Sequence, residues 1–153
     1  MRRFKFLPLW IALFAMVSSV DAAEPRIVKV LTQYLDLQGR HTLSPSLFER
    51  DAYQDQLRQH PAQRSGIRFA IQWKARGMNS SHLKVRVELR GLKGNDLQTK
   101  SSEAPAGKPG WLTTWSTAEL AGADYQQFGE IVAWRVALLD GEMQIAEQKS
   151  FLW

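Results

Sequence analysis

Basic side chains recur at alternate positions in two neighbouring stretches of this sequence. They are Arg68, Lys74, Arg76, Lys84, Arg86 and Arg90. Alternate residues of a β-strand point to the same side of a sheet. If the two stretches pair as strands, these side chains therefore project from one face, relieved only by Glu88. Such a face would attract an anionic glycan, lipid head groups or an acidic protein surface.

A purely structural interpretation of this basic face is also open. Lysine and arginine keep an exposed sheet soluble and block pairing between sheet edges. Nucleic acid is the less expected partner, because single-strand binders interleave aromatic side chains with the basic ones, and no aromatic side chain does so on this face.

Tryptophan offers a second kind of binding chemistry, because sugar rings lie flat against exposed indoles. Trp111 and Trp115 lie beside a glycine-rich stretch and are expected on one side of a strand. Of the tryptophans, this pair is the best candidate for a ligand-binding aromatic surface, although packing in the core is the favoured interpretation. Trp73 and Trp134 fall on the apolar faces of alternating stretches, so both are predicted to be core residues.

Catalytic and metal-binding arrangements are harder to find. The histidines are His41, His60 and His82, and none lies in a nucleophile, zinc or phosphate-binding motif. Asp51 and Asp55 would share a helix face that neighbouring arginines make a solvated surface. The chain has no cysteine, which excludes disulfides, thiol nucleophiles and zinc–thiolate sites. We therefore predict no enzyme activity, metal site or cofactor; the alternative is a small envelope hydrolase acting through His41 or His60.

Hydrophobic patterns predict mostly extended structure. Residues 26–37 are rich in Ile, Val, Leu and Tyr and read as a first strand. Apolar and polar residues alternate through 67–76 and again through 83–90, which predicts two half-buried antiparallel strands joined by a polar loop. A Thr- and Trp-rich strand is expected over 111–120.

Turn residues divide the rest of the chain. Residues 91–110 are rich in Gly and Pro, so they predict a long loop with at most one weak edge strand. A turn is expected over 121–127. Residues 131–139 and 143–152 flank the Asp-Gly pair at 140–141, which is a strong hairpin signal.

One helix interrupts the predicted strands. Residues 44–60 carry apolar side chains at helical spacing, Ser46 and Glu49 match a capping box, and Pro61 ends the pattern. Six or seven short strands with one helix, and no strand–helix–strand alternation, predict an antiparallel β-sandwich.

The N-terminus has the layout of a secretory signal peptide. A basic start precedes an apolar run over 6–17, and small residues lead to an expected cleavage after Ala22. The run is shorter than the about 20 residues that cross a bilayer, so no transmembrane segment is predicted in the mature chain; an uncleaved anchor is the alternative. We predict a signal peptide over 1–22, one domain over 23–153, and export to the periplasm or beyond.

The C-terminal hairpin carries a family resemblance. Residues 129–136, 140–141 and 149–151 read Gly-Glu-Ile-Val-Ala-Trp-Arg-Val, Asp-Gly and Lys-Ser-Phe. This run resembles the closing strand pair of fibronectin type III and immunoglobulin-like modules in exported bacterial proteins. The resemblance implies an immunoglobulin-like sandwich in which the helix is an insertion, and a scaffold for binding or spacing rather than a chemistry.

These observations lead to one prediction of fold and function. The mature chain is expected to be an all-β, antiparallel immunoglobulin-like β-sandwich with one short inserted helix. It is expected to act as a non-catalytic binding or accessory module whose partner is a protein or an anionic glycan or lipid. The alternative is a structural or assembly subunit of an envelope complex, held by strand addition at an open sheet edge. The identity of the ligand and the oligomeric state are left open.

Overall fold

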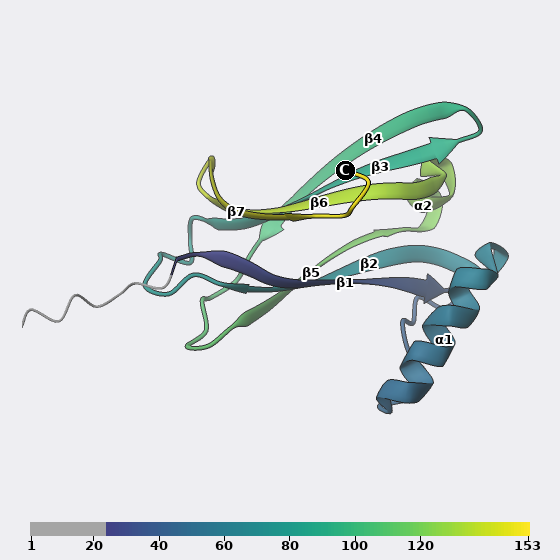
Figure 1. Ribbon diagram of the computed structural model, residues 1–153, viewed down its shortest axis with the longest axis horizontal. Helices are drawn as coiled ribbons and strands as arrows, with labels where there is room; N and C mark the ends of the chain where they lie inside the picture. Colours follow the sequence, from purple (N-terminus) through teal and green to yellow (C-terminus); the bar gives the residue numbers. More distant parts are fainter. Residues whose placement is uncertain (1–23) are drawn as a thin grey trace, which may run out of the picture.

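The computed structural model describes residues 24–153, and these form two antiparallel β-sheets packed face to face (Figure 1). In chain order the elements are β1 (Arg26–Asp36), α1 (Leu47–Gln59), the short 3-10 helix η1 (Pro61–Gln63), β2 (Arg64–Lys74), β3 (Leu83–Lys93), β4 (Asp96–Pro105), β5 (Thr114–Ala121), α2 (Gly122–Phe128), β6 (Glu130–Asp140) and β7 (Met143–Lys149). The predicted signal peptide, 1–22, lies outside the described residues. No helix within residues 24–153 is both long and apolar enough to cross a membrane.

One sheet has the strand order β1-β2-β5, and the other has the order β4-β3-β6-β7. Every strand pair in both sheets is antiparallel. The prediction of a mostly-β chain with antiparallel sheets is confirmed. The predicted helix is present as α1 between β1 and β2, and α2 is a second short helix where the sequence predicted a turn.

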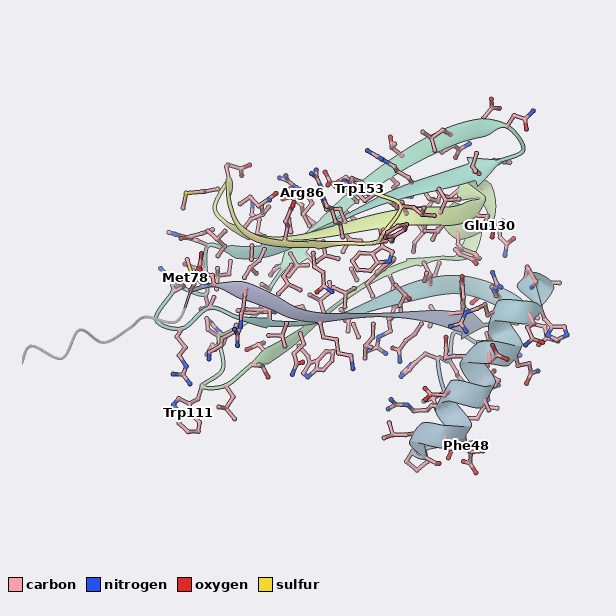
Figure 2. All side chains as sticks on the ribbon, in the orientation of Figure 1. Phe48, Met78, Arg86, Trp111, Glu130 and Trp153 are labelled. Atoms are coloured by element: carbon pink, nitrogen blue, oxygen red, sulfur yellow. The ribbon has the colours of Figure 1, made fainter. Side chains whose placement is uncertain are left out.

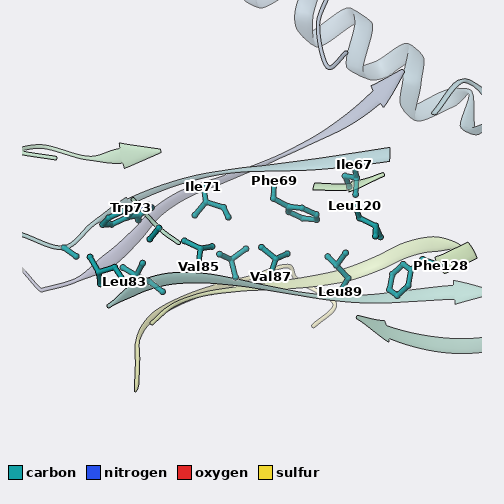
Figure 3. Packing of buried hydrophobic residues seen from close by; sticks show 14 residues of the cluster. Ile67, Phe69, Ile71, Trp73, Leu83, Val85, Val87, Leu89, Leu120 and Phe128 are labelled. Atoms are coloured by element: carbon teal, nitrogen blue, oxygen red, sulfur yellow. The ribbon is translucent and has the colours of Figure 1, made fainter. Parts of the chain in front are cut away.

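The core lies between the two sheets, where the apolar face of β2 meets that of β3 (Figure 3). The facing side chains are Ile67, Phe69, Ile71 and Trp73 of β2 and Leu83, Val85, Val87 and Leu89 of β3. Trp73 is fully buried, which confirms its prediction as a core residue. Trp134 of β6 is half-buried and packs against the core; its ring meets that of Phe69 edge-on, with centroids 6.2 Å apart.

The predicted pairing of β2 with β3 is wrong. β2 pairs with β1 and β5, whereas β3 pairs with β4 and β6 in the other sheet. The loop over 75–82 therefore crosses from one sheet to the other, and the apolar faces of the two strands pack together across the core. An alternating pattern shows which side of a strand is buried. It does not show whether two such strands lie side by side or face to face.

The predicted long loop over 91–110 is wrong for most of its length, but the edge strand that the prediction allowed within it is present as β4. β3 continues to Lys93, and β4 then pairs with β3 along its whole length after a turn at Gly94, where φ is +63°. β4 is an edge strand whose side chains are largely exposed. Its backbone ladder with β3 holds it in place, so it needs few apolar residues and carries no clear pattern.

α1 is attached to the sandwich by its C-terminal end. Ser46 is the N-cap residue, as predicted, but its side chain makes no capping hydrogen bond, so the capping box does not form. Leu57 is the buried residue of the helix, and the Arg64 guanidinium donates to the carbonyl oxygens of Leu57 and Arg58. A cation is favourable at this end of a helix. The other end, with exposed Phe48, extends away from the sheets (Figure 2).

The turn between β1 and α1 is organised by a buried carboxylate, Asp36. Its oxygens accept hydrogen bonds from the Tyr53 hydroxyl (2.7 Å), the Arg40 Nε (2.8 Å) and the backbone amides of Arg40 and Gln38 (2.8 and 2.9 Å). Burial raises the pKa of Asp36, but the hydrogen bonds outweigh it and lower this pKa from 3.8 to about 2. Asp36 is therefore a structural anion that joins β1, the turn and α1.

Candidate functional site

The structure separates the basic residues that the sequence placed on one face. Arg68 and Lys74 lie on the outer face of sheet β1-β2-β5, and Arg76 follows at the end of β2. Lys84, Arg86 and Arg90 lie on the outer face of sheet β4-β3-β6-β7. Arg86 and Trp111 mark these two opposite sides of the molecule in Figure 2. The single basic face is therefore wrong, because β2 and β3 belong to different sheets.

On the β3 side, carboxylates largely neutralise the cations. Arg86 Nη2 lies 2.6 Å from Glu103 Oε1, and Lys84 Nζ lies 3.7 Å from Glu103 and 3.4 Å from Glu142. The hydrogen bond from Arg86 lowers the pKa of Glu103, as does the charge of Lys84. Glu103 belongs to β4, a strand with no clear pattern of apolar residues. The sequence therefore did not indicate that Glu103 would lie opposite Arg86.

The guanidinium group of Arg90 lies over the ring of Trp153. Its guanidinium carbon lies 4.2 Å from the centre of the Trp153 ring, and that of Arg135 lies 5.1 Å from the same ring. Arg135 in turn forms an ion pair with Glu88. These contacts hold the C-terminal segment against the sheet, and they leave Arg90 with little free surface for an external anion.

Arg68 belongs to a separate cluster beside α1. Its guanidinium lies 3.8 Å from Glu119 Oε1 and 3.2 Å from His41 Nδ1. Burial lowers the pKa of His41, and the positive charges of Arg68 and Arg50 add to this effect. His60, itself exposed, instead contacts the carbonyl oxygen of Gln56 at the C-terminal end of α1. The two histidines of the hydrolase alternative therefore make no shared contact.

The two candidate tryptophans are both exposed. Trp111 is 80% exposed and Trp115 is 50% exposed. Trp115 lies opposite Gln72 in the pairing of β5 with β2, so it shares the outer face of the sheet, and Trp111 lies in the loop that leads into β5. Core packing, the favoured interpretation of this pair, is therefore wrong. An exposed apolar surface that several side chains share can mark a binding site.

The loop that carries Trp111 is fixed by hydrogen bonds to β2 and β5. The Arg76 Nε donates to the carbonyl oxygen of Trp111 (2.8 Å), and the Arg76 guanidinium carbon lies 5.8 Å from the Trp111 ring centre. The Gln72 amide donates to the Thr113 hydroxyl (3.0 Å), and the Gly110 amide donates to the Thr114 hydroxyl (2.6 Å). The backbone that carries the indole is thus held in place before any ligand arrives.

We define the aromatic-basic surface as Lys74, Arg76, Trp111 and Trp115. Within residues 24–153, neither Lys74 nor Arg76 lies within 4.0 Å of a carboxylate, in contrast to the ion-paired Lys84 and Arg86. Two flat apolar faces and two cations without acidic partners therefore lie at one end of sheet β1-β2-β5. Chemically this surface can stack a ring and attract an anion.

Comparisons with protein families, curated proteins and solved structures find no match for this chain. The candidate site therefore depends on the geometry alone. Within residues 24–153, no group of three His, Asp or Glu side chains gathers in a way that could hold a metal ion.

Proposed function

We propose that this chain is an exported, non-catalytic binding module that takes an acidic polysaccharide on its aromatic-basic surface. The observation that carries the proposal is the exposure of Trp111 and Trp115 beside Lys74 and Arg76, two cations that no carboxylate of the described chain neutralises. The proposal keeps the predicted class of function and four of the predicted site residues. It leaves aside Arg68, Lys84 and Arg86, which lie within 4.0 Å of a carboxylate. It also leaves aside Arg90, which is half-buried against Trp153, whereas Arg76 stays exposed beside Trp111.

Ring stacking together with charge favours an acidic sugar chain over the other predicted partners. The indole face is electron-rich and apolar, so it suits the C–H face of a sugar ring. A neighbouring lysine and arginine supply hydrogen bonds and charge for a carboxylate or sulfate on the same chain. A lipid head group offers the charge without the flat ring, and it would leave Trp111 without a stacking partner.

The fold supports a binding scaffold of the immunoglobulin-like class. The order β1-β2-β5 against β4-β3-β6-β7 has the arrangement expected of a fibronectin type III-like module, with the fourth strand beside the third. α1 is then an insertion between the first two strands. Such modules serve as scaffolds whose function is set by local surface residues.

Affinity electrophoresis tests the proposed ligand class. Alginate supplies carboxylates, heparin supplies sulfates, and dextran is the neutral control. The protein is expected to be retarded by alginate or heparin and not by dextran, and added salt should weaken the retardation. Stronger binding to anionic phospholipid vesicles than to both polysaccharides would contradict the proposal.

Three variants locate the binding surface. Trp111→Ala with Trp115→Ala, and separately Lys74→Glu, are each expected to weaken binding at least about tenfold, because each removes a central contact. Arg86→Glu is the matched control: it reverses a charge on the opposite sheet and should leave binding within about twofold, since Arg86 already pairs with Glu103. An equal loss in Arg86→Glu would show that charge alone, and not this surface, drives retention.

A further inference from the structure

The two sheets end unevenly on the side of the molecule formed by β4 and β5. Sheet β4-β3-β6-β7 has four strands, whereas sheet β1-β2-β5 has three. On the other side of the sandwich, β1 lies against β7. β4 extends past the core without a strand of the other sheet to cover it.

The inner face of β4 shows the consequence of this missing cover. Lys100 lies opposite Leu89 and Ser102 lies opposite Val87 in the strand pairing, so both point toward the space between the sheets. They are nevertheless polar, and they stay accessible to solvent. An inward-facing lysine is tolerated there because no strand packs over it.

A cavity of about 300 Å³ opens at this place. Its walls include the core side chains of Phe69, Val87, Leu89 and Leu120. An ion pair between Lys100 Nζ and Asp124 Oδ2, 2.5 Å apart, links β4 to α2 at its border. The volume is at the lower end for small-molecule pockets and suits one or two apolar side chains.

The edge of β5 that borders this cavity is unprotected. Within residues 24–153, β5 pairs with β2 on one side and has no strand on the other. Edge strands are usually blunted by lysine, proline or an irregular register. The other edges have such features: Lys29 and a register shift in β1, Pro105 in β4, and Lys149 in β7. β5 contains no Lys, Arg or Pro, and its one charged side chain, Glu119, forms an ion pair with Arg68 of β2.

We propose that an extended segment of a partner protein adds to β5 as a fourth strand of this sheet and inserts an apolar side chain into the cavity. The free backbone groups of β5 would bind the backbone of the segment, and alternate apolar side chains would point inward. A second copy of this chain fits less well. Its β5, pairing antiparallel about Ala118, would present Ala118 and Ser116 to the cavity, and these are too small to fill it.

A peptide library tests this docking site directly. The probe is a displayed library of ten-residue peptides with Val, Ile, Leu or Phe at alternate positions, selected against the immobilised protein. Selected peptides are expected to slow hydrogen exchange of the backbone amides over residues 114–121. Failure to select any peptide, protection of β1, β4 or β7 instead, or dimerisation of the protein through β5 would each overturn the proposal.

Two neighbouring substitutions separate the cavity from the outer surface. Ala118→Phe fills the cavity from within and should weaken peptide binding at least about tenfold. Thr117→Phe adds the same side chain on the outer face of the same strand and should leave binding within about twofold, because Thr117 lies opposite Ala70, on the face away from the core. Equal effects of the two would contradict insertion into the cavity. Thermal unfolding confirms that each variant is folded.

The proposal of a strand-binding site at β5 and the proposal of a polysaccharide-binding surface can be tested independently. Trp111→Ala should leave peptide binding unchanged, and Ala118→Phe should leave polysaccharide retardation unchanged, because the two sites use opposite faces of β5. Loss of both activities in either variant would show that the two surfaces are not separate.

Discussion

Replacing Asp36 by asparagine changes a buried carboxylate that accepts several hydrogen bonds within the described chain. The carboxylate is 4% exposed and accepts four hydrogen bonds, from Tyr53, Gln38 and Arg40. Asparagine has nearly the same shape, but its amide group is a donor, and on either oxygen position it would face a donor of the protein. The change therefore removes the charge and leaves at least one donor unsatisfied, without opening a cavity.

The pKa of Asp36 sets the size of the effect and its pH range. The folded-state pKa of about 2 lies below the ordinary value of 3.8. Because the folded-state pKa is the lower one, the ionised carboxylate stabilises the fold fully above pH 3.8, and this contribution is lost as the pH falls toward about 2. The shift corresponds to about 2 kcal/mol at neutral pH.

Urea unfolding of both proteins between pH 7 and pH 2 measures this difference. Asp36→Asn is expected to be less stable by about 2 to 3 kcal/mol at pH 7, and the two unfolding free energies should converge as the acid limit is approached. Tyr53→Phe, which removes one donor, should lower the stability by about 1 kcal/mol. If the wild-type protein and Asp36→Asn lose stability in parallel from pH 4 to pH 2, the carboxylate does not carry the acid dependence and the reasoning is refuted.

Three further outcomes follow from packing and backbone geometry. Trp134→Ala should lower the unfolding free energy by about 3 kcal/mol in chemical denaturation, since the ring is half-buried against Phe69; a loss below about 1 kcal/mol would contradict its place in the packing. Gly129→Ala should cost about 2 to 4 kcal/mol by the same measurement, because φ is +84° and an added Cβ would collide with the Leu92 carbonyl oxygen; unchanged stability would contradict this turn geometry. Arg86→Gln, which removes the ion pair without placing a second carboxylate opposite Glu103, should shift the thermal midpoint only slightly, and a large shift would show that this pair is a main support of the sheet.

Strand positions could be predicted wherever one face of a strand is buried. The alternation in β2 and β3 identified Trp73 and its neighbours as core, and the Asp-Gly turn placed the hairpin of β6 and β7. β4 could be predicted only as a weak edge strand within a long loop, because its stability comes from backbone pairing with β3, which leaves little trace in side-chain type. α2 escaped prediction because a helix of this length offers too few positions for a periodic pattern.

The candidate site depends on tertiary structure to a greater degree. From the sequence, Trp111 and Trp115 could be named as candidates. Only the fold shows that both are exposed and that Arg76 binds the Trp111 backbone in the loop between β4 and β5. For the basic residues, the sequence pattern was misleading. Their spacing is regular, yet Lys74 and Arg86 lie on different sheets, and Glu103 neutralises Arg86.

By itself, the sequence determined the class of structure, the inward faces of the central strands and the residue types available for binding. These are properties of short segments, where the two-residue period of a strand and the chemistry of a turn act locally. Tertiary structure alone decided which strands share a sheet, which cations meet a carboxylate, and which edge and cavity stay open. Those outcomes depend on contacts between residues far apart in the chain, and local patterns do not encode which of several compatible partners a strand will meet.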